Sequence, residues 1–451
     1  MTYFFETYGC QMNSAESAAL LLVCREKGWE AAEDGENADL VLINTCSVRN
    51  TAERRALGRI ALYAALKKKR PARPFALVVA GCMAQRAGEK LREKHPAVDY
   101  VMGTAARSLF PLILDAVENA AAGENRGFPE VALDETGAAP EFAFSGSHLE
   151  EGRFRSFVPV MHGCDGFCSY CVVPYVRGRE VSRDPAMIAR EIRLVGERGV
   201  REVTLLGQNV NAYNWNGGEL DFAGLLRTVA GEAEKSGVKW LRFLSANPKD
   251  FSSETVRAMA EHGVFCRHLH LCVQHGSDRI LAAMNRGYTR ERYLLLVDEI
   301  RRAMPGISLS TDILVGFPGE TEEDFLEVLS LMDEIRFQYA YTYHFNPMEG
   351  TAACGLPNRV EEPVKRERLS RVIALQKKHT AAVLKERIGA RETVLVEGIS
   401  RKNADELVTR TERDETVVAP GSASMIGSFA ELTVSELRGN TFRAKGLSPT
   451  A

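Results

Sequence analysis

Hydrophobic and polar positions alternate between strand-like and helix-like patterns over the first 117 residues. Three short apolar runs are typical of buried parallel strands, at residues 3–7, 40–44 and 75–80. Stretches with helical spacing, residues 14–27 and 51–68, lie between them. The order strand, helix, strand, helix predicts a parallel sheet covered by helices, an α/β unit.

A second alternation of strands and helices begins near residue 157. Its six expected strands cover residues 157–161, 202–206, 240–244, 268–273, 308–314 and 338–342. Helical patterns lie between these strands, at residues 185–196, 220–233, 289–304 and 321–335. Six strand–helix units are fewer than the eight of a closed barrel, so we expect a partial (βα)6 barrel, with an open doubly wound sheet as the alternative.

After a charged helix near residues 363–387 the pattern changes to short strands. The expected strands are residues 392–398, 407–411, 415–418, 428–437 and 441–445, separated by Gly, Asp and Asn. This pattern predicts a small antiparallel β-barrel. We therefore expect domains at 1–117, 150–382 and 385–448, with a linker rich in Gly, Pro and Ser at 118–149.

Length and composition are those of a globular protein with more than one domain. A chain of 451 residues is too long for a single hydrophobic core. Its contents of 45% hydrophobic and 26% charged residues are those of ordinary globular proteins. No apolar run is long enough to cross a membrane and no signal peptide is recognisable, so we expect a cytoplasmic protein. The net charge of −3 neither indicates nor excludes a nucleic-acid partner.

Three cysteines lie close together in the motif C-x-x-x-C-x-x-C, as Cys164, Cys168 and Cys171. Gly163 and Gly166 allow the backbone to curl so that the three thiols face one point. A structural zinc site needs four ligands, and no fourth Cys or His follows closely. We therefore favour a 4Fe-4S cluster with one open iron, the arrangement of radical chemistry with S-adenosylmethionine; zinc and a plain electron-transfer cluster are the alternatives.

A second triplet is spread over the first domain. Cys10, Cys46 and Cys82 each follow an expected strand, and they are spaced by one strand–helix unit. Loops that follow parallel strands emerge at the same edge of a sheet, so the three thiols can converge. We expect a second 4Fe-4S cluster here, and we expect the remaining cysteines to be core or surface thiols: Cys24, Cys266, Cys272 and Cys354.

Polar loops after two of the barrel strands point to a nucleotide-like ligand. Gly207 and Gln208 follow the second strand, and Asp312 with Gly316 belongs to the fifth. Together with Gln274 on the fourth strand, they are the expected contacts of S-adenosylmethionine at the barrel mouth.

Basic residues and histidines near these loops leave several interpretations open. Arginines near the two triplets suit either phosphates or a solvated surface: Arg49, Arg54, Arg55, Arg177 and Arg179. Residues 67–70 end a helix, where positive charge is favourable in any case. For the histidines of the fourth strand, we expect packing or substrate contact rather than metal binding, because no carboxylate stands at metal spacing: His268, His270 and His275.

Four segments resemble the radical-SAM methylthiotransferases over nearly the whole chain, and among them the type that acts on isopentenyladenosine in tRNA. The segments are residues 8–13, 44–49, 164–175 and 206–213. The resemblance implies an N-terminal methylthiotransferase domain, a radical-SAM core and a C-terminal TRAM barrel. Members of the family usually carry Pro and Ser where this chain has Cys272 and His275. That departure bears on ligand contacts along the fourth strand.

The resemblance also implies a mechanism. The cluster on Cys164, Cys168 and Cys171 would reduce S-adenosylmethionine to a 5′-deoxyadenosyl radical, which takes hydrogen from carbon 2 of an isopentenylated adenine next to the anticodon. The cluster on Cys10, Cys46 and Cys82 would deliver the methylthio unit. Implied partners are a tRNA anticodon stem-loop and an electron donor such as a flavodoxin or ferredoxin, and we expect a monomer.

Other functions remain open from the sequence. Sister families act on threonylcarbamoyl-adenosine in tRNA or on an aspartate of a ribosomal protein. A protein of another class, an iron–sulfur electron carrier or redox sensor, would carry similar cysteines without an S-adenosylmethionine pocket or a barrel for RNA.

Overall fold

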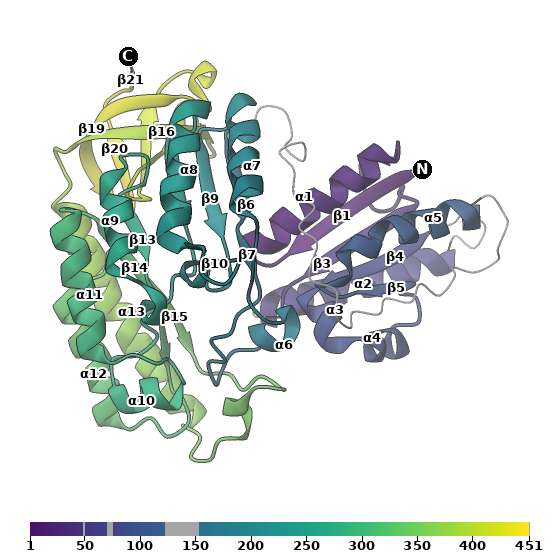
Figure 1. Cartoon of the computed structure of the whole chain (residues 1–451), viewed down its shortest axis with the longest axis horizontal. Coiled ribbons are helices and arrows are strands. Elements are labelled where there is room, and N and C mark those ends of the chain that lie inside the picture. Colours follow the sequence, from purple (N-terminus) through teal and green to yellow (C-terminus); the bar gives the residue numbers. More distant parts are fainter. Residues whose placement is uncertain (48–49, 70–74, 122–152, 451) are drawn as a thin grey trace.

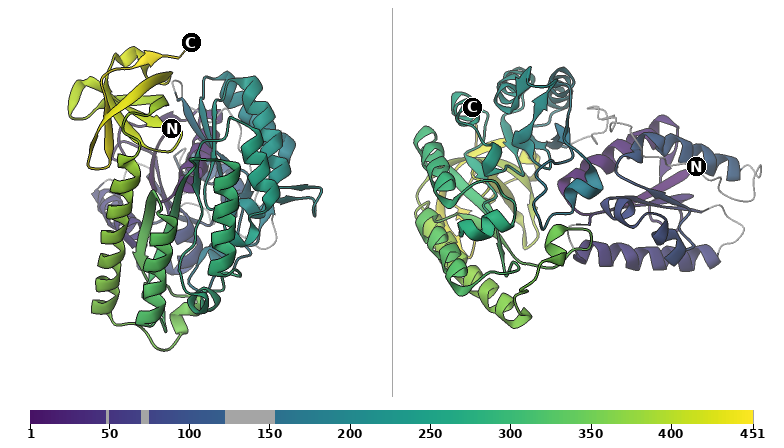
Figure 2. Two further views of the ribbon diagram at one scale, coloured as in Figure 1. Left: turned by 90° about the vertical axis from the view of Figure 1, so that its left-hand side faces the viewer. Right: turned by 60° about the horizontal axis from the view of Figure 1, so that its bottom comes forward.

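The computed structural model describes residues 1–47, 50–69, 75–121 and 153–450. Three units follow one another along the chain: an N-terminal sheet with helices, a central half-open barrel, and a small C-terminal barrel (Figure 1). The N-terminal unit stands to one side of the central unit, whereas the C-terminal barrel caps one end of it (Figures 1 and 2).

The N-terminal unit is a five-stranded parallel sheet in the order β2-β1-β3-β4-β5. Its strands are β1 (Thr2–Tyr8), β2 (Glu30–Ala31), β3 (Leu40–Thr45), β4 (Ala76–Gly81) and β5 (Tyr100–Met102). Its helices are α1 (Gln11–Glu26), α2 (Asn50–Lys69), α3 (Cys82–Ala87), α4 (Glu89–Lys94) and α5 (Phe110–Ala121), with the short turn η1 (Ala106–Leu109). Every residue of β3 and β4 is buried, because helices cover both faces of the sheet.

Three of these strands and two of the helices lie where the hydrophobic pattern predicts them. Strands β2 and β5 were not predicted, because runs of two and three residues carry no readable periodicity. Helix α5 continues to Ala121, past the expected start of the linker at residue 118. The rest of that linker, residues 122–149, lies outside the described residues.

The central unit contains six parallel strands whose spatial order follows the chain. They are β6 (Arg155–Pro159), β9 (Glu202–Leu206), β12 (Trp240–Phe243), β13 (His268–His270), β14 (Ser308–Val315) and β15 (Tyr339–His344). Two three-stranded ladders, β12-β9-β6 and β13-β14-β15, are joined by parallel bridges such as Ala246 to Leu271. This arrangement is the predicted partial (βα)6 barrel rather than a doubly wound sheet.

Helices cover the outside of the half-barrel and bury one continuous hydrophobic core. They are α7 (Pro185–Glu197), α8 (Phe222–Ser236), α9 (Ser253–Glu261), α10 (Asp278–Ala283), α11 (Arg290–Ala303), α12 (Glu322–Ile335) and α13 (Glu362–Lys385). Helix starts are fixed by side-chain caps, for example Asp221 at α8 and Thr321 at α12. Shorter elements complete the unit: β7 (Met161–His162), α6 (Val173–Arg177), β8 (Val181–Ser182), η3 (Val210–Ala212), β10 (Asn214–Trp215), β11 (Leu220–Asp221), η4 (Pro248–Asp250) and η5 (Ala352–Gly355).

The C-terminal unit is a small barrel, to which α13 leads (Figure 2). Its elements are β16 (Arg391–Ser400), β17 (Asn403–Thr411), β18 (Thr416–Pro420), η6 (Ala423–Met425), β19 (Phe429–Arg438), β20 (Thr441–Ala444) and β21 (Ser448–Pro449). Pairing of β16 with both β17 and β19 closes the sheet on itself. The predicted barrel is present, but it is not wholly antiparallel, since β18 and β20 pair in parallel.

The two smaller units pack on different parts of the central barrel. Helix α1 lies against the strand side through Met12, Ala15 and Leu206, and α3 lies against α6 through Cys82 and Val176. The C-terminal barrel packs through Trp240, Phe429 and their neighbours. The N-terminal unit therefore meets the central unit next to its own cysteines.

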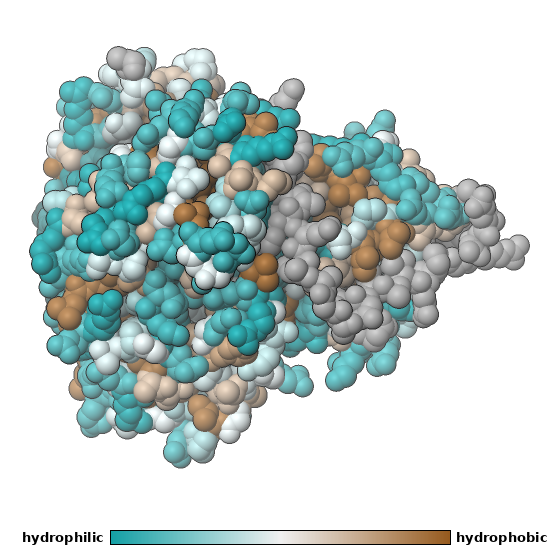
Figure 3. Space-filling view, viewed as in Figure 1, coloured by the Kyte–Doolittle hydropathy of each residue, from teal (hydrophilic) through white to brown (hydrophobic). Residues whose placement is uncertain are grey.

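The face shown in Figure 3 is mostly hydrophilic, with hydrophobic residues scattered singly or in small groups. Among the helices of the described residues, none is long and apolar enough to span a membrane.

Candidate active site between two cysteine triplets

The first cysteine triplet is brought together by strand register. Tyr8, Thr45 and Gly81 lie side by side on β1, β3 and β4, so these strands end at one level. Cys10 follows two residues later, Cys46 directly follows β3, and Cys82 begins α3. The convergence predicted from the spacing is therefore a consequence of three adjacent parallel strands of matching length.

Two glycines leave the room that these cysteines need. A Cβ on Gly9 would lie 2.6 Å from the Cβ of Cys46. A Cβ on Gly81 would lie 2.4 Å from Asn44 Oδ1 and 2.5 Å from the carbonyl oxygen of Thr45. A larger residue at either position would push the triplet apart.

Two thiols of this triplet, those of Cys10 and Cys46, interact directly. A hydrogen bond with Cys46 is the main reason why the pKa of Cys10 falls to about 6. The Cys10 thiol also contacts Asn13 Oδ1 at 3.2 Å. Burial raises the pKa of Cys82, while the nearby guanidinium of Arg177 opposes that rise. A low thiol pKa favours the thiolate form that ligates iron.

The second triplet lies on the loop that follows β7, at the mouth of the half-barrel. Backbone N–H groups point at two of its sulfurs, from Gly166 to Cys164 Sγ at 3.3 Å and from Val173 to Cys171 Sγ at 3.4 Å. The guanidinium of Arg286 donates to Cys168 Sγ at 3.3 Å. Donors aimed at sulfur suit an iron–sulfur cluster, because hydrogen bonds to its sulfurs stabilise their negative charge.

Glycine is required once in this loop. Gly163 has φ +79°, and a Cβ there would lie 1.9 Å from the carbonyl oxygen of Arg179. Its N–H donates to Gln208 Oε1 at 2.6 Å, which fixes the start of the loop. Burial raises the pKa of Cys164 to about 11 and that of Cys171 to about 12, so these thiols become thiolates only with a cation at hand.

The spacing of the thiols suits a cluster better than a single ion. Within the described residues, one group of three donor atoms lies within 4.8 Å of one another, and it is neither cysteine triplet. One zinc ion needs its ligands at closer range. The thiols of neither triplet are therefore gathered as closely as a single zinc ion would need.

The group within 4.8 Å is His270, Cys272 and Asp312. The expectation that no carboxylate stands at metal spacing from these histidines was wrong, because Asp312 comes from the neighbouring strand β14, which the sequence around the histidines does not show. His268 and His270 both contact Ser310 Oγ, at 2.9 and 3.0 Å.

A buried ion cluster lies where the N-terminal and central units meet. Arg177, at the end of α6, binds Glu16 of α1 at 2.7 Å, and Arg107 binds the same carboxylate at 3.0 Å. Thr104 of the N-terminal unit donates to the carbonyl oxygen of Val176 at 2.6 Å. These contacts tie the loop of the second triplet to the edge that carries the first.

Arg177 is thus neither a solvated residue nor an exposed phosphate contact, the two interpretations that the sequence left open. Its side chain is 3% exposed. Arg179, two residues on, is exposed and pairs with Asp165 at 2.6 Å. A pattern of two arginines around one glycine does not reveal which of them points inward.

The three units match three known families in chain order. Residues 2–103 match Uncharacterized protein family UPF0004, residues 158–332 the Radical SAM superfamily, and residues 385–447 the TRAM domain. A tRNA-2-methylthio-N(6)-dimethylallyladenosine synthase from Treponema pallidum is 46% identical over 98% of both chains. A protein of the same name from Treponema denticola is 47% identical over 98% of this chain and 99% of its own.

This chain belongs to the tRNA-2-methylthio-N(6)-dimethylallyladenosine synthase family.

Solved structures share much of this fold. The radical S-adenosylmethionine methyltransferase TsrM from Kitasatospora setae, solved with cobalamin and a 4Fe-4S cluster, superposes with a TM-score of 0.57 at 16% identity, covering 78% of this chain and 77% of its own. The radical enzyme OxsB gives a TM-score of 0.51 at 11% identity, covering 84% of this chain and 56% of its own.

Two residues expected to contact S-adenosylmethionine have structural partners in this member of the synthase family. Gln208 accepts the hydrogen bond from Gly163 and so supports the cluster loop. Gly207 is small because a Cβ there would lie 2.7 Å from Met161 Cγ. Both residues lie at the barrel mouth, as the sequence predicts. In this structure their contacts hold the neighbouring loop in place.

The remaining three expected contacts lie together on the other ladder. Gln274 Nε2 faces Asp312 Oδ2 at 3.5 Å, and Gln274 has φ +69°. Gly316 has φ +73°, and its N–H donates to Glu320 Oε2 at 2.7 Å. A Cβ on Gly316 would lie 2.5 Å from Lys365 Cγ. Asp312 and Gln274 thus form one polar patch, and Gly316 shapes the turn behind it.

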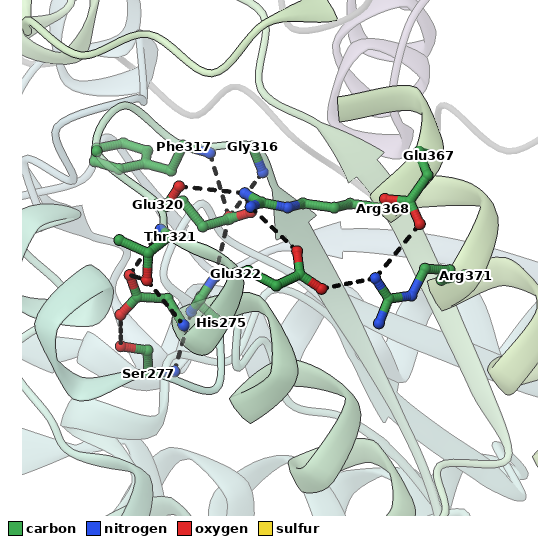
Figure 4. A network of polar contacts seen from close by, with 12 residues as sticks. His275, Ser277, Gly316, Phe317, Glu320, Thr321, Glu322, Glu367, Arg368 and Arg371 are labelled. Atoms are coloured by element: carbon green, nitrogen blue, oxygen red, sulfur yellow. Dashed lines mark hydrogen bonds and ion pairs between the residues drawn. The ribbon is translucent and has the colours of Figure 1, made fainter. Parts of the chain in front are cut away.

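His275, one of the two departures from the usual family residues, is a structural residue. It is wholly buried, and its Nε2 contacts Glu320 Oε2 at 3.1 Å. Glu320 also binds Arg368 of α13 at 2.7 Å, so the network of Figure 4 joins the loops after β13 and β14 to α13. The second departure, Cys272, lies in the ligand group of His270 and Asp312.

The other residues singled out in the sequence are placed as follows. Arg54 lines a hollow of about 360 Å³ between α2, α3 and residues 347–349, together with Arg86. Arg49 and Arg70 lie outside the described residues. Lys67, at the end of α2, binds Asp99, a partner that the sequence did not predict. Cys24 and Cys266 are buried core thiols, as predicted.

Sequence reasoning missed Glu16, Arg107 and Arg286, which surround the two triplets. Glu16 is a charged residue among small and apolar ones on α1, in the run Ser14-Ala15-Glu16-Ser17-Ala18-Ala19. A lone acid on the apolar face of a helix is the signal that could have marked it as buried and paired.

Proposed function

We propose that this chain methylthiolates carbon 2 of N(6)-isopentenyladenosine next to the anticodon of tRNA, with S-adenosylmethionine as radical source and methyl donor. The observation that carries the proposal is the meeting of two cysteine triplets. Cys10, Cys46 and Cys82 lie at the end of one parallel sheet, and the loop of Cys164, Cys168 and Cys171 leads into α6, which packs against Cys82. Radical generation and sulfur transfer need such neighbouring centres.

Three thiols in each triplet, with N–H and guanidinium donors aimed at the sulfurs of the second, support a 4Fe-4S cluster with one open iron at each. When bound, a cluster in the central unit would supply the electron that cleaves S-adenosylmethionine, and a cluster in the N-terminal unit would deliver the methylthio unit. An electron donor such as a flavodoxin or ferredoxin would provide the electron.

The residues of the chain hold these groups in place. Arg286 donates to Cys168 and also to the carbonyl oxygen of Cys272 at 2.8 Å, so it couples the cluster loop to the floor of the barrel. Gln274 and Asp312 present an amide and a carboxylate on that floor, which suits the hydroxyl groups of a ribose. We place S-adenosylmethionine there, between this patch and the loop of Gly207 and Gln208.

Aromatic side chains on the same face of the barrel suit an RNA base. Tyr339, Tyr341 and Tyr343 alternate along β15, and Tyr341 pairs directly with Asp312. Each of the three exposes 46–47% of its surface. Exposed aromatic faces beside a polar floor are the surroundings in which unstacked bases of a single-stranded loop bind. Arg54 and Arg86, with the C-terminal TRAM barrel, would contact phosphates outside the pocket.

We further propose a monomer that works in the cytoplasm, where tRNA is found. For the domains, we keep the division into residues 1–117, 150–382 and 385–448 with a linker at 118–149, except that helix α5 extends the first domain to Ala121 and shortens the linker. The spans matched by the three families support this division.

Two multiple variants test the proposed function. Cys10, Cys46 and Cys82 changed to Ala should leave 5′-deoxyadenosine formation from S-adenosylmethionine and abolish methylthio-nucleoside in tRNA. Cys164, Cys168 and Cys171 changed to Ala should abolish both. The readouts are chromatography of the nucleoside product and mass spectrometry of digested tRNA.

The same measurements separate the alternatives. No 5′-deoxyadenosine from the unchanged protein under reductant would indicate an electron carrier and overturn the proposal. Unchanged methylthio-adenosine in tRNA from cells that lack the protein would favour a ribosomal-protein substrate. Loss of methylthiolated threonylcarbamoyl-adenosine instead of isopentenyladenosine would favour the other tRNA type.

A further inference from the structure

Arg177 belongs to the central unit, but its side chain reaches into the N-terminal unit. It ends α6, the helix that follows the cluster loop of the central unit. Its guanidinium crosses to the N-terminal unit, where it binds Glu16 at 2.7 and 3.3 Å. It lies beside Cys82 and also acts electrostatically on Cys10. One side chain therefore connects the two cysteine triplets.

The charged side chains around the first triplet, leaving aside its own thiols, do not cancel. Burial would raise the pKa of Glu16, but Arg177 and Arg107 outweigh it and hold that pKa at about 2, so Glu16 is ionised. Burial lowers the pKa of His162 to about 3, which keeps that neighbour neutral. Two guanidinium groups face one carboxylate, so Arg177, Arg107 and Glu16 together carry one net positive charge, which a Cys10 thiolate can offset.

Stability alone is a poor explanation for this arrangement. Burying an ion pair costs about as much desolvation free energy as its attraction returns. Arg107 adds a second buried positive charge, which repels Arg177. The pKa of Arg107 is accordingly lowered, first by burial and further by Arg177. An excess positive charge becomes favourable when an anionic group occupies the cysteines.

We propose that Arg177 sets the electron affinity of the cluster held by Cys10, Cys46 and Cys82, acting across the boundary between the two units. The inference rests on the proposed second cluster. Positive charge in a buried site stabilises the more reduced, more negative state of an iron–sulfur group, and hydrogen bonds to its sulfurs act in the same direction. Glu16 opposes this effect and holds the guanidinium in position, so Arg177 is a positioning residue rather than a catalytic one.

The test is a redox titration followed by electron paramagnetic resonance. The full-length chain with Cys164, Cys168 and Cys171 changed to Ala isolates the first cluster. Within it, Arg177→Met should move the midpoint potential to more negative values, because a positive charge is removed. Glu16→Gln should move it to more positive values, because a negative charge is removed. Arg177→Lys, which keeps the charge, should stay closer to the unchanged chain than Arg177→Met.

A matched control is available in a second buried ion pair. Arg183 binds Glu191 at 2.8 Å, and each of these side chains is 2% exposed, much like Arg177 and Glu16. Glu191→Gln removes a charge of equal burial in the central unit, whereas the strongest charges on Cys10 and Cys82 come from Arg177 and Glu16. The potential of this control should not change.

The opposite signs distinguish the inference from a structural role. A merely structural role would give equal potentials in all variants, or loss of the cluster in both Arg177→Met and Glu16→Gln, and either result overturns the inference. If Arg177→Met alone fails to fold, the midpoint potential of Glu16→Gln is the test. A shift to more positive values supports the inference, and an unchanged potential overturns it.

Iron analysis separates this inference from the proposed function. If the chain without the second triplet binds no iron while its fold is retained, the proposed first cluster is wrong. If it binds a cluster whose potential ignores Arg177 and Glu16, the first cluster stands and the inference falls. If that chain does not fold, the same variants are compared with all cysteines present, and the signs required are unchanged.

Discussion

At the scale of single residues, the site depends on glycines and charges that allow no substitute. The cluster loop approaches the carbonyl oxygen of Arg179 at Gly163, so closely that no side chain fits at this position. Glu16 is ionised inside the protein because two arginines surround it. Both residues act on the cysteines without being ligands themselves.

Replacing Gly163 by Ala should prevent assembly of the cluster in the central unit. The new Cβ would lie 1.9 Å from backbone, so the loop must move and the three thiols separate. Iron content should fall by about half relative to a chain with two clusters. Gly199→Ala is the control, because Gly199 also has positive φ, +91°, but nothing lies within 4 Å of its Cβ position. Full iron content in Gly163→Ala would contradict this account.

Ionisation of Glu16 should make the stability of the apoprotein depend on acid pH. Its folded pKa of about 2 lies below the ordinary 4.5, so its contribution is complete above pH 4.5 and is lost as the pH falls toward 2. The loss amounts to about 3 kcal/mol at most. Tryptophan fluorescence during acid titration should show a shallower decline for Glu16→Gln. Glu26→Gln, an exposed change on the same helix, should titrate like the unchanged chain.

At the scale of elements, α13 and the loops after β13 and β14 form one block. Glu320, which is buried, accepts from Arg368, from His275 and from the backbone of Gly316 (Figure 4). Since Gly316 and Gln274 belong to the proposed S-adenosylmethionine site, this block is the back wall of that site.

Glu320→Gln should destabilise the protein far more than Glu322→Gln. Both carboxylates bind Arg368, at 2.7 and 3.4 Å, but Glu320 is fully buried whereas Glu322 is 47% exposed. Breaking a buried pair costs about 3 kcal/mol, and an exposed one less than about 1 kcal/mol. Denaturant unfolding of the two variants measures the difference, and equal losses would show that the buried network is not a structural wall.

At the scale of the whole molecule, function depends on how two sheets are docked. The N-terminal sheet ends at its cysteines, and the central unit presents its cluster loop to the same region. Small side chains on α1 allow this close approach: Ala15 is buried against Leu206 of β9.

Ala15→Phe should uncouple the two halves of the reaction. A large ring at this contact pushes the units apart, while each sheet stays intact. Formation of 5′-deoxyadenosine should continue, and methylthio-nucleoside per 5′-deoxyadenosine should drop by an order of magnitude or more, because a displacement of about 1 Å costs a factor of about 100. Ser14→Phe places the same ring on the exposed side of α1 and should keep the ratio. An unchanged ratio in Ala15→Phe would mean that the docking seen here is not needed.

The sequence by itself determined the order of the units, most of their long strands and helices, and both cysteine triplets. Periodicity shows which face of each strand or helix is buried, and the spacing of Cys10, Cys46 and Cys82 by one strand–helix unit follows from a parallel sheet. Such patterns are local, so one chain is enough to read them. The sequence did not predict that β18 and β20 pair in parallel, because strand direction in a small barrel depends on partners far apart in sequence.

Only the tertiary structure decided what the charged residues do. Arg177 and Arg179 look alike in sequence, yet one is buried against Glu16 and the other is exposed. His275 looked like a neighbour of His270, but it turns to Glu320 and α13 instead. The physical reason is that a charged or polar side chain is fixed by partners from other elements, whereas an apolar one is fixed by its own periodicity.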